Sequence, residues 1–184
     1  MISAGRILLV PVIVWLMVLQ TRPASVVAAA VFVVGALTDG LDGYLARRWD
    51  TSTKTGQWLD PLADKALVAA PVITLTIQGL FPVWAAVLIL VREVGIALLR
   101  VVLGTRGRSM PATWPAKVKT VLQLTAITMY ILPLGTWADG LKLAVLIVAV
   151  AVTVVTGVQY AVRATRGPRD PATPGGTPDA ERAS

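Results

Sequence analysis

Long apolar runs separated by short polar breaks dominate the hydrophobic pattern of this chain. The length of each run is close to that of a helix that crosses the hydrocarbon core of a bilayer, about 20 residues. The breaks carry the Pro, Gly and charged residues that are typical of connections, as in "QTRPAS" and "QGLFP". The pattern predicts six transmembrane helices, at residues 4–20, 24–46, 57–78, 82–104, 116–134 and 137–162.

The composition also favours a membrane protein. Of the 184 residues, 55% are hydrophobic and 15% are charged, and a soluble domain of this size could not bury so much apolar surface in one core. We therefore expect an all-α integral membrane bundle formed by residues 1–164. Residues 165–184 are rich in Pro, Gly and charge, which predicts a disordered tail without chemistry. A cleaved signal peptide is the alternative for the first run, but its length and the runs that follow favour a first span.

Lysine and arginine predict the orientation of the helices. Six spans place both termini on one side of the membrane, and most of the basic residues near span ends lie on that side, with only Arg22 and Lys142 on the other. By the positive-inside rule, we expect a multi-pass protein of the cell membrane with both termini cytoplasmic. The net charge of +7 fits anionic lipid head groups or anionic substrates better than nucleic acid, because no nucleic-acid-binding module is visible.

The chain contains neither histidine nor cysteine. This composition excludes disulfides, His-based zinc sites, and His bases or nucleophiles. It therefore excludes phospholipase D-like lipid enzymes, which work through a histidine nucleophile.

Four aspartates bracket the polar connection between the second and third predicted spans. Asp39 and Asp42 are three residues apart, and Asp60 and Asp64 are four apart, so on helices each pair lies on one face. The short connection makes the two spans antiparallel neighbours. Four carboxylates are therefore expected to converge near the cytoplasmic interface.

Four like charges at this depth need compensation, since they repel one another and an aspartate at mid-membrane costs about 3 kcal/mol on insertion scales. One or two bound divalent cations would compensate them. Oxygen ligands favour Mg²⁺, Mn²⁺ or Ca²⁺ over zinc. Any single aspartate could instead have a purely structural role as a solvated helix cap. Intramembrane acids in this number and spacing favour a functional site.

Small residues accompany the acids. Gly43 and Gly56 suit either close approach of a ligand to the backbone or close packing of helices, and Ala46 extends the small face. Arg47 projects toward the interface, where it can pair with a phosphate or extend into solvent.

Eight positions of this stretch resemble the signature of the CDP-alcohol phosphatidyltransferases: Asp39-x2-Asp42-Gly43-x2-Ala46-Arg47-x8-Gly56-x3-Asp60-x3-Asp64. The resemblance includes six spans with cytoplasmic termini, and so covers the chain apart from its tail. The stretches "WLDPLADKA", "VREVGIALLR" and "PAKVKTVLQ" resemble the phosphatidylglycerophosphate synthase branch of that family. The first residues depart from the branch, because only Arg6 remains of its usual Asn-Pro-Asn-x-x-Thr-x-x-Arg stretch.

The resemblance implies transfer of the phosphatidyl group of CDP-diacylglycerol to an alcohol, with release of CMP. It implies that two divalent cations, Mg²⁺ or Mn²⁺, are ligated by Asp39, Asp42, Asp60 and Asp64, and that Asp64 is also the catalytic base. A homodimer in membrane lipid is expected from the family as well. The nucleotide-binding residues that it implies are Asp42, Gly43, Ala46, Arg47 and Gly56.

The branch also implies an acceptor, glycerol 3-phosphate, whose phosphate needs cations. The candidates are Arg92, Arg100, Lys117 and Lys119. Adjacent positions of a helix do not share a face, so we expect Arg92 to face the cavity while Glu93 pairs elsewhere. On the other side of the membrane, the isolated pair Asp139 and Gly140 predicts a turn.

Two kinds of alternative stay open. The same chemistry can use phosphatidylglycerol as the acceptor, giving cardiolipin, or inositol phosphate. A divalent-cation transporter would instead place its acids near the midplane, on helices that are broken there. Here the acids bracket a cytoplasmic loop with basic residues nearby that would repel a cation, so the transporter ranks last.

Overall fold

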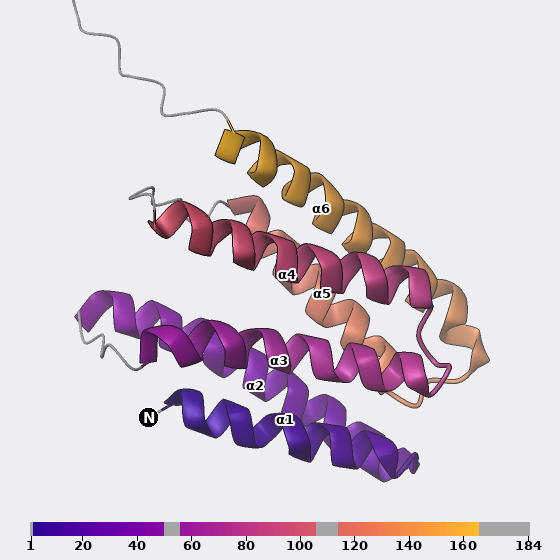
Figure 1. Cartoon of the computed structure of the whole chain (residues 1–184). Helices are drawn as coiled ribbons and strands as arrows, with labels where there is room; N and C mark the ends of the chain where they lie inside the picture. The colour runs from indigo at the N-terminus through magenta and orange to yellow at the C-terminus, as the bar shows by residue number, and fades with distance from the viewer. Residues whose placement is uncertain (1, 50–55, 106–113, 166–184) are drawn as a thin grey trace, which may run out of the picture.

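The computed structural model describes the backbone of residues 2–49, 56–105 and 114–165, and the side chains of residues 8–38, 65–99, 101–103 and 118–162. All the regular structure in these ranges is helical (Figure 1). The elements are α1 (Ile2–Val18), α2 (Arg22–Trp49), α3 (Gly56–Ile77), α4 (Val83–Thr105), α5 (Trp114–Ile131), the 3-10 helix η1 (Thr136–Ala138) and α6 (Asp139–Thr165).

The six predicted helices are confirmed as helices, and their ends agree to within three residues. The fifth was expected to run to residue 134 but ends at Ile131, because Pro133 lacks an N–H group and disfavours helical geometry in the residue before it. The turn predicted at Asp139 and Gly140 is wrong. These residues begin α6, where the Asp139 carboxylate lies in the first turn and interacts favourably with the helix dipole.

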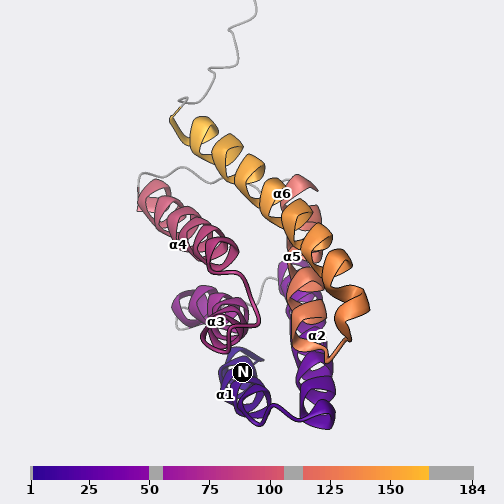
Figure 2. The ribbon, with the colours of Figure 1, turned by 90° about the vertical axis from the view of Figure 1, so that its right-hand side faces the viewer.

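The helices form two layers of three. In one layer α3 lies between α1 and α4, and in the other α5 lies between α2 and α6 (Figure 2). The layers touch where α1 meets α2, where α3 meets α5 and α2, and where α4 meets α6. Each helix contributes a large, fully buried side chain to the shared core: Ile13, Phe32, Leu75, Ile89, Ile127 and Leu146.

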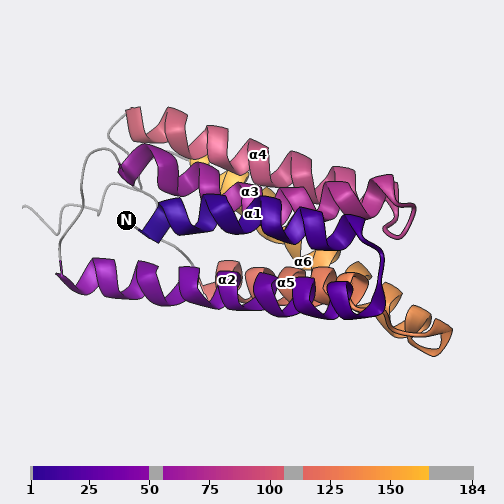
Figure 3. The same ribbon diagram turned by 90° about the horizontal axis from the view of Figure 1, so that it is seen from below.

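Successive helices run in opposite directions, so their connections alternate between the two ends of the bundle (Figure 3). The start of α1 and the end of α6 lie at the end where α2 stops and α3 begins. We call the opposite end the far end. It holds three short connections, at residues 19–21, 78–82 and 132–138.

The outer faces of the described helices are apolar. Large side chains are exposed on separate helices, among them Leu37 at 62%, Val91 at 65% and Val121 at 63%, which is unusual for a surface in contact with water. Within the described residues, the segment Thr136–Val162 is long and apolar enough to cross a membrane. Shorter apolar stretches occur at Leu8–Val18, Arg22–Thr38, Lys65–Ile77 and Val118–Ile131.

The far-end connection between α3 and α4 depends on Gly79, whose φ of +70° is left-handed. The Leu80 N–H donates to the Leu75 carbonyl at 3.0 Å and the Gly79 N–H to the Thr76 carbonyl at 3.1 Å. This is the Schellman arrangement, which satisfies the last carbonyls of a helix.

We expect Gly79→Ala to lower the free energy of unfolding by about 1 kcal/mol, because a residue with a Cβ is strained at this φ. Denaturant unfolding in detergent measures the change. Gly95→Ala, in the interior of α4 with no described atom within 4 Å of the added Cβ, is the matched control and should be neutral or stabilising. Equal destabilisation by both substitutions would contradict the explanation.

Candidate functional site

The predicted metal-binding aspartates lie in pairs on two helices that contact each other. Asp39 and Asp42 belong to the last part of α2. Asp60 and Asp64 belong to the first part of α3. Because both stretches are helical, each pair is one turn apart. The side chains of these aspartates lie outside the described residues, as do six other predicted site positions: Gly43, Ala46, Arg47, Gly56, Arg100 and Lys117.

Four charged side chains meet where α3, α4 and α5 come together, and we call them the Glu93 cluster: Lys65, Arg92, Glu93 and Lys119. Lys119 Nζ donates a hydrogen bond to Glu93 Oε1. Arg92 Nη1 lies 3.5 Å from the same oxygen, and Lys65 Nζ lies 3.8 Å from Glu93 Oε2. One carboxylate therefore faces three cations that come from three helices.

The Glu93 cluster is largely shielded from solvent. The side chain of Lys119 is 7% exposed, and those of Arg92 and Glu93 are 16% and 18% exposed. Charges at such depth need oppositely charged partners to offset their lost hydration. Glu93 supplies that partner to all three cations. Along α3, Lys65 directly follows Asp64, so the cluster borders the acidic stretch.

Gly157 of α6 provides room for Arg92. A Cβ at Gly157 would lie 3.2 Å from Arg92 Cγ and 3.6 Å from Arg92 Nε, and the first distance is closer than carbon atoms normally pack. Because α6 approaches the stem of Arg92 at a glycine, this helix forms one wall of the Glu93 cluster.

Two buried polar side chains lie on α5 and α6, one turn from Lys119 and from Gly157 respectively. Gln123 follows Lys119 by four residues on α5, and Thr153 precedes Gly157 by four residues on α6. Gln123 is 2% exposed and Thr153 is fully buried. Within the described part of the chain, neither Gln123 Oε1 nor Thr153 Oγ1 has a hydrogen-bond partner. A buried polar atom without a partner costs about 1–3 kcal/mol, so this interior suits water or a polar ligand.

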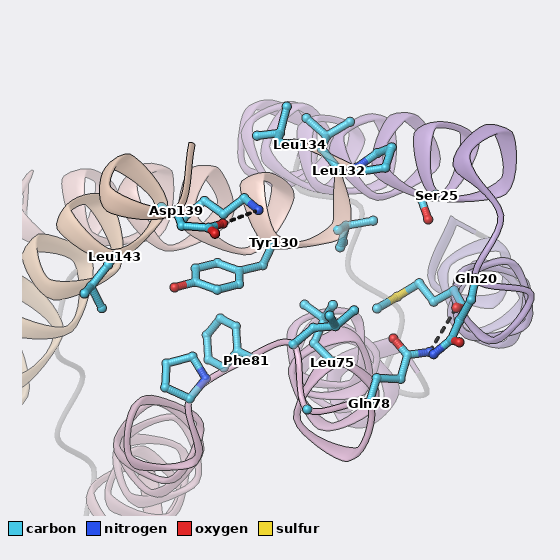
Figure 4. A pocket seen from close by; sticks show the side chains of 17 residues that line it. Gln20, Ser25, Leu75, Gln78, Phe81, Tyr130, Leu132, Leu134, Asp139 and Leu143 are labelled. Atoms are coloured by element: carbon cyan, nitrogen blue, oxygen red, sulfur yellow. Dashed lines mark hydrogen bonds and ion pairs between the residues drawn. The ribbon is translucent and has the colours of Figure 1, made fainter. Parts of the chain in front are cut away.

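A separate cavity of about 930 Å³ lies at the far end, among the three connections (Figure 4). Three of its polar side chains are paired: Gln78 Nε2 donates to a backbone carbonyl of α1 at 2.9 Å, and Lys142 Nζ lies 3.2 Å from Asp139 Oδ1. Gln78 directly follows the last residue of α3 and is 13 residues beyond Lys65, which corresponds to about 20 Å along the helix axis. The cavity is therefore distinct from the Glu93 cluster and from the aspartates.

Of the predicted acceptor-binding residues, the structure describes the side chains of Arg92 and Lys119 and brings them to one carboxylate. Glu93 pairs with lysines of other helices, as expected, but it also contacts Arg92, which the expectation of separate faces for the two residues did not include. The long Arg92 side chain reaches across the angle between adjacent positions. The sequence analysis missed Lys65. A lysine inside an apolar span requires a partner, and that signal could have found it.

Comparison with known proteins identifies the family to which the chain belongs. A model of the CDP-alcohol phosphatidyltransferase family matches residues 1–155. The matched region runs from α1 into α6 and includes both aspartate pairs, the Glu93 cluster and the far-end connections.

The chain is also similar to curated bacterial proteins. A probable phosphatidylglycerophosphate synthase of Mycobacterium tuberculosis (strain H37Rv) is 42% identical over 143 residues, which cover 78% of this chain and 68% of the relative. A CDP-diacylglycerol–glycerol-3-phosphate 3-phosphatidyltransferase of Salmonella choleraesuis is 34% identical over 172 residues, covering 91% and 93%. A protein of the same name from Shigella flexneri is 33% identical over 165 residues, covering 87% and 90%.

Proposed function

We propose that this chain, which belongs to the CDP-alcohol phosphatidyltransferase family, transfers the phosphatidyl group of CDP-diacylglycerol to glycerol 3-phosphate and releases CMP. The names of relatives that align along nearly the whole chain support this acceptor. The structural observation that carries the proposal is the Glu93 cluster. It gathers three cations inside the bundle, and one of them comes from α3, the helix that bears Asp60 and Asp64.

We expect the four aspartates of α2 and α3 to hold two divalent cations, Mg²⁺ or Mn²⁺. The donor set fits, because carboxylate oxygens are the ligands that these ions prefer and the two helices that carry the aspartates contact each other. Bound there, the cations would neutralise the negative charge of the diphosphate during transfer.

The residues of the chain then divide the work. The Asp64 carboxylate takes the proton from the acceptor hydroxyl while the oxygen of that hydroxyl attacks the β-phosphorus in line. The bond between that phosphorus and the oxygen bridging to the α-phosphate breaks, and CMP leaves with the bonding electrons. The positions proposed to hold the nucleotide are Asp42, Gly43, Ala46, Arg47 and Gly56.

The Glu93 cluster is proposed to bind the phosphate of the acceptor. The ammonium of Lys119 has three N–H donors and the guanidinium of Arg92 has five, so both can bind a phosphate while they contact Glu93. Lys117 lies two residues before Lys119, and Arg100 lies two turns beyond Arg92. A small dianion suits several converging cations better than the single charge of phosphatidylglycerol does, which favours glycerol 3-phosphate over the acceptor of cardiolipin synthesis.

In the membrane, we propose that all six helices span the bilayer, with the aspartates and both termini at the cytoplasmic face. The basic residues near that end support this orientation. The apolar outer faces of the helices suit contact with lipid. A homodimer is proposed from membership of the family.

An assay in detergent tests the proposed reaction. We expect the purified protein to release CMP from CDP-diacylglycerol with glycerol 3-phosphate when Mg²⁺ or Mn²⁺ is present, and to stop when EDTA removes the metal. CMP release with phosphatidylglycerol or inositol phosphate, but not with glycerol 3-phosphate, would contradict the proposed acceptor and identify the other alcohol in its place. Cation flux in liposomes without CMP release from any acceptor would favour the transporter instead.

A further inference from the structure

We propose that Glu93 is a positioning residue for the acceptor: its carboxylate holds Lys119, Arg92 and Lys65 in the arrangement that binds the acceptor's phosphate, without touching the substrate itself. The inference deepens the proposed function and rests on it. The chemical class of the ligand is a phosphate monoester, the dianionic group that a phosphorylated alcohol presents.

The two oxygens of Glu93 divide the cations between them. Oε1 accepts from Lys119 and lies 3.5 Å from Arg92 Nη1, whereas Oε2 lies 3.8 Å from Lys65 Nζ. Three cations gathered around one carboxylate repel one another in an interior of low dielectric constant. The shared carboxylate opposes this repulsion and so fixes the spacing of three side chains that belong to three different helices.

The cationic side chains of the Glu93 cluster are preorganised for binding an anion. Lysine and arginine side chains lose much rotamer freedom when they bind a ligand, and a site that has already ordered them binds more tightly. Lys119 is 7% exposed and held by Glu93, while Arg92 is 16% exposed and its Nη1 lies 3.5 Å from the same carboxylate. Part of this ordering is therefore complete before an acceptor arrives.

A purely structural role for Glu93 makes a different prediction. If the carboxylate only compensated the buried charge of Lys119, its loss would reduce stability and the amount of active protein, and thus the apparent kcat. It would leave the KM for the acceptor unchanged. A positioning role raises the KM for the acceptor and leaves the KM for CDP-diacylglycerol unchanged, since the lipid nucleotide binds at the aspartates.

The experiment compares Glu93→Gln and Glu93→Asp with the wild type, using the full chain in detergent with glycerol 3-phosphate as the varied substrate. We expect Glu93→Gln to raise the KM for glycerol 3-phosphate by about tenfold or more, and the KM for CDP-diacylglycerol by less than about twofold. Glu93→Asp keeps the charge but shortens the side chain by one methylene. It should give an intermediate KM, and it tests the proposal even where Glu93→Gln does not fold.

A double substitution tests whether Glu93 acts through its neighbour. In a Lys119→Met background, Glu93→Gln should raise the KM for glycerol 3-phosphate clearly less than it does alone, because residues that act as one unit are not additive. The matched control is Asp139→Asn, which removes a carboxylate that pairs with a lysine at the far end. It should leave both KM values unchanged.

An unchanged acceptor KM in folded Glu93→Gln or Glu93→Asp overturns the positioning role, as does an equal rise in both KM values. Fully multiplicative effects in the double variant also overturn it. Failure of the proposed function gives a different result, because the wild type would then release no CMP with glycerol 3-phosphate. If the wild type prefers another phosphorylated alcohol, the same KM comparison with that acceptor still tests Glu93.

Discussion

Asp64→Asn is expected to lower kcat by about a thousandfold while the protein still binds CDP-diacylglycerol. Asparagine keeps the shape of the side chain and one oxygen ligand, but it cannot take the proton from the acceptor hydroxyl. Loss of a general base typically lowers kcat by about a hundred- to ten-thousandfold, and we expect a fall near the middle of that range. Asp64 directly precedes Lys65 on the first part of α3, so the proposed base and the proposed phosphate site share one stretch of that helix.

Calorimetric titration of the variant with CDP-diacylglycerol, together with the steady-state rate of CMP release, measures the two effects separately. Asp139→Asn is the matched control, because it makes the same chemical change at the start of α6, at the opposite end of the bundle, and it should keep full activity. If Asp64→Asn loses nucleotide binding and turnover to the same extent, Asp64 serves mainly to hold metal and another group is the base.

Lys119→Met should lower kcat/KM for glycerol 3-phosphate by about a hundredfold, corresponding to about 2.7 kcal/mol of transition-state binding. Methionine fills a similar volume without the charge. The variant loses a phosphate ligand and leaves Glu93 without its hydrogen-bonded partner, so both effects act in the same direction.

Kinetics with each substrate varied in turn test this expectation. Lys142→Met removes another lysine that is ion-paired, to Asp139 at the far end, and is the matched control. It should not change kcat/KM for either substrate. A Lys119→Met protein that folds and keeps a wild-type kcat/KM for glycerol 3-phosphate would contradict phosphate binding at the Glu93 cluster.

The helices could be predicted from the sequence because each one is a long apolar run bounded by strong local signals. Pro133 and Gly79 illustrate such signals, since each acts on the backbone at its own position and neither needs tertiary information. Asp139 was misread for the opposite reason. An Asp-Gly pair favours a turn and Asp favours the first turn of a helix, and local sequence does not decide between the two.

The Glu93 cluster was only partly predictable. Arg92 and Lys119 could be selected from the sequence because charged residues inside apolar spans are costly and usually belong to a functional site. Their convergence on Glu93, and the part played by Lys65, depend on how α3, α4 and α5 pack, which spacing along one chain does not contain. The aspartate pairs differ in this respect, because their pattern lies within 26 consecutive residues and carries the family resemblance by itself.

The most direct test of the metal site is anomalous scattering at the aspartate end of the bundle. It is measured on crystals grown with excess Mn²⁺ and a CDP nucleotide. We predict anomalous peaks between α2 and α3, within about 2.5 Å of carboxylate oxygens from Asp39, Asp42, Asp60 and Asp64, with the diphosphate against them. Side chains of these aspartates that point away from one another, without a peak between them, would contradict the metal-assisted reaction.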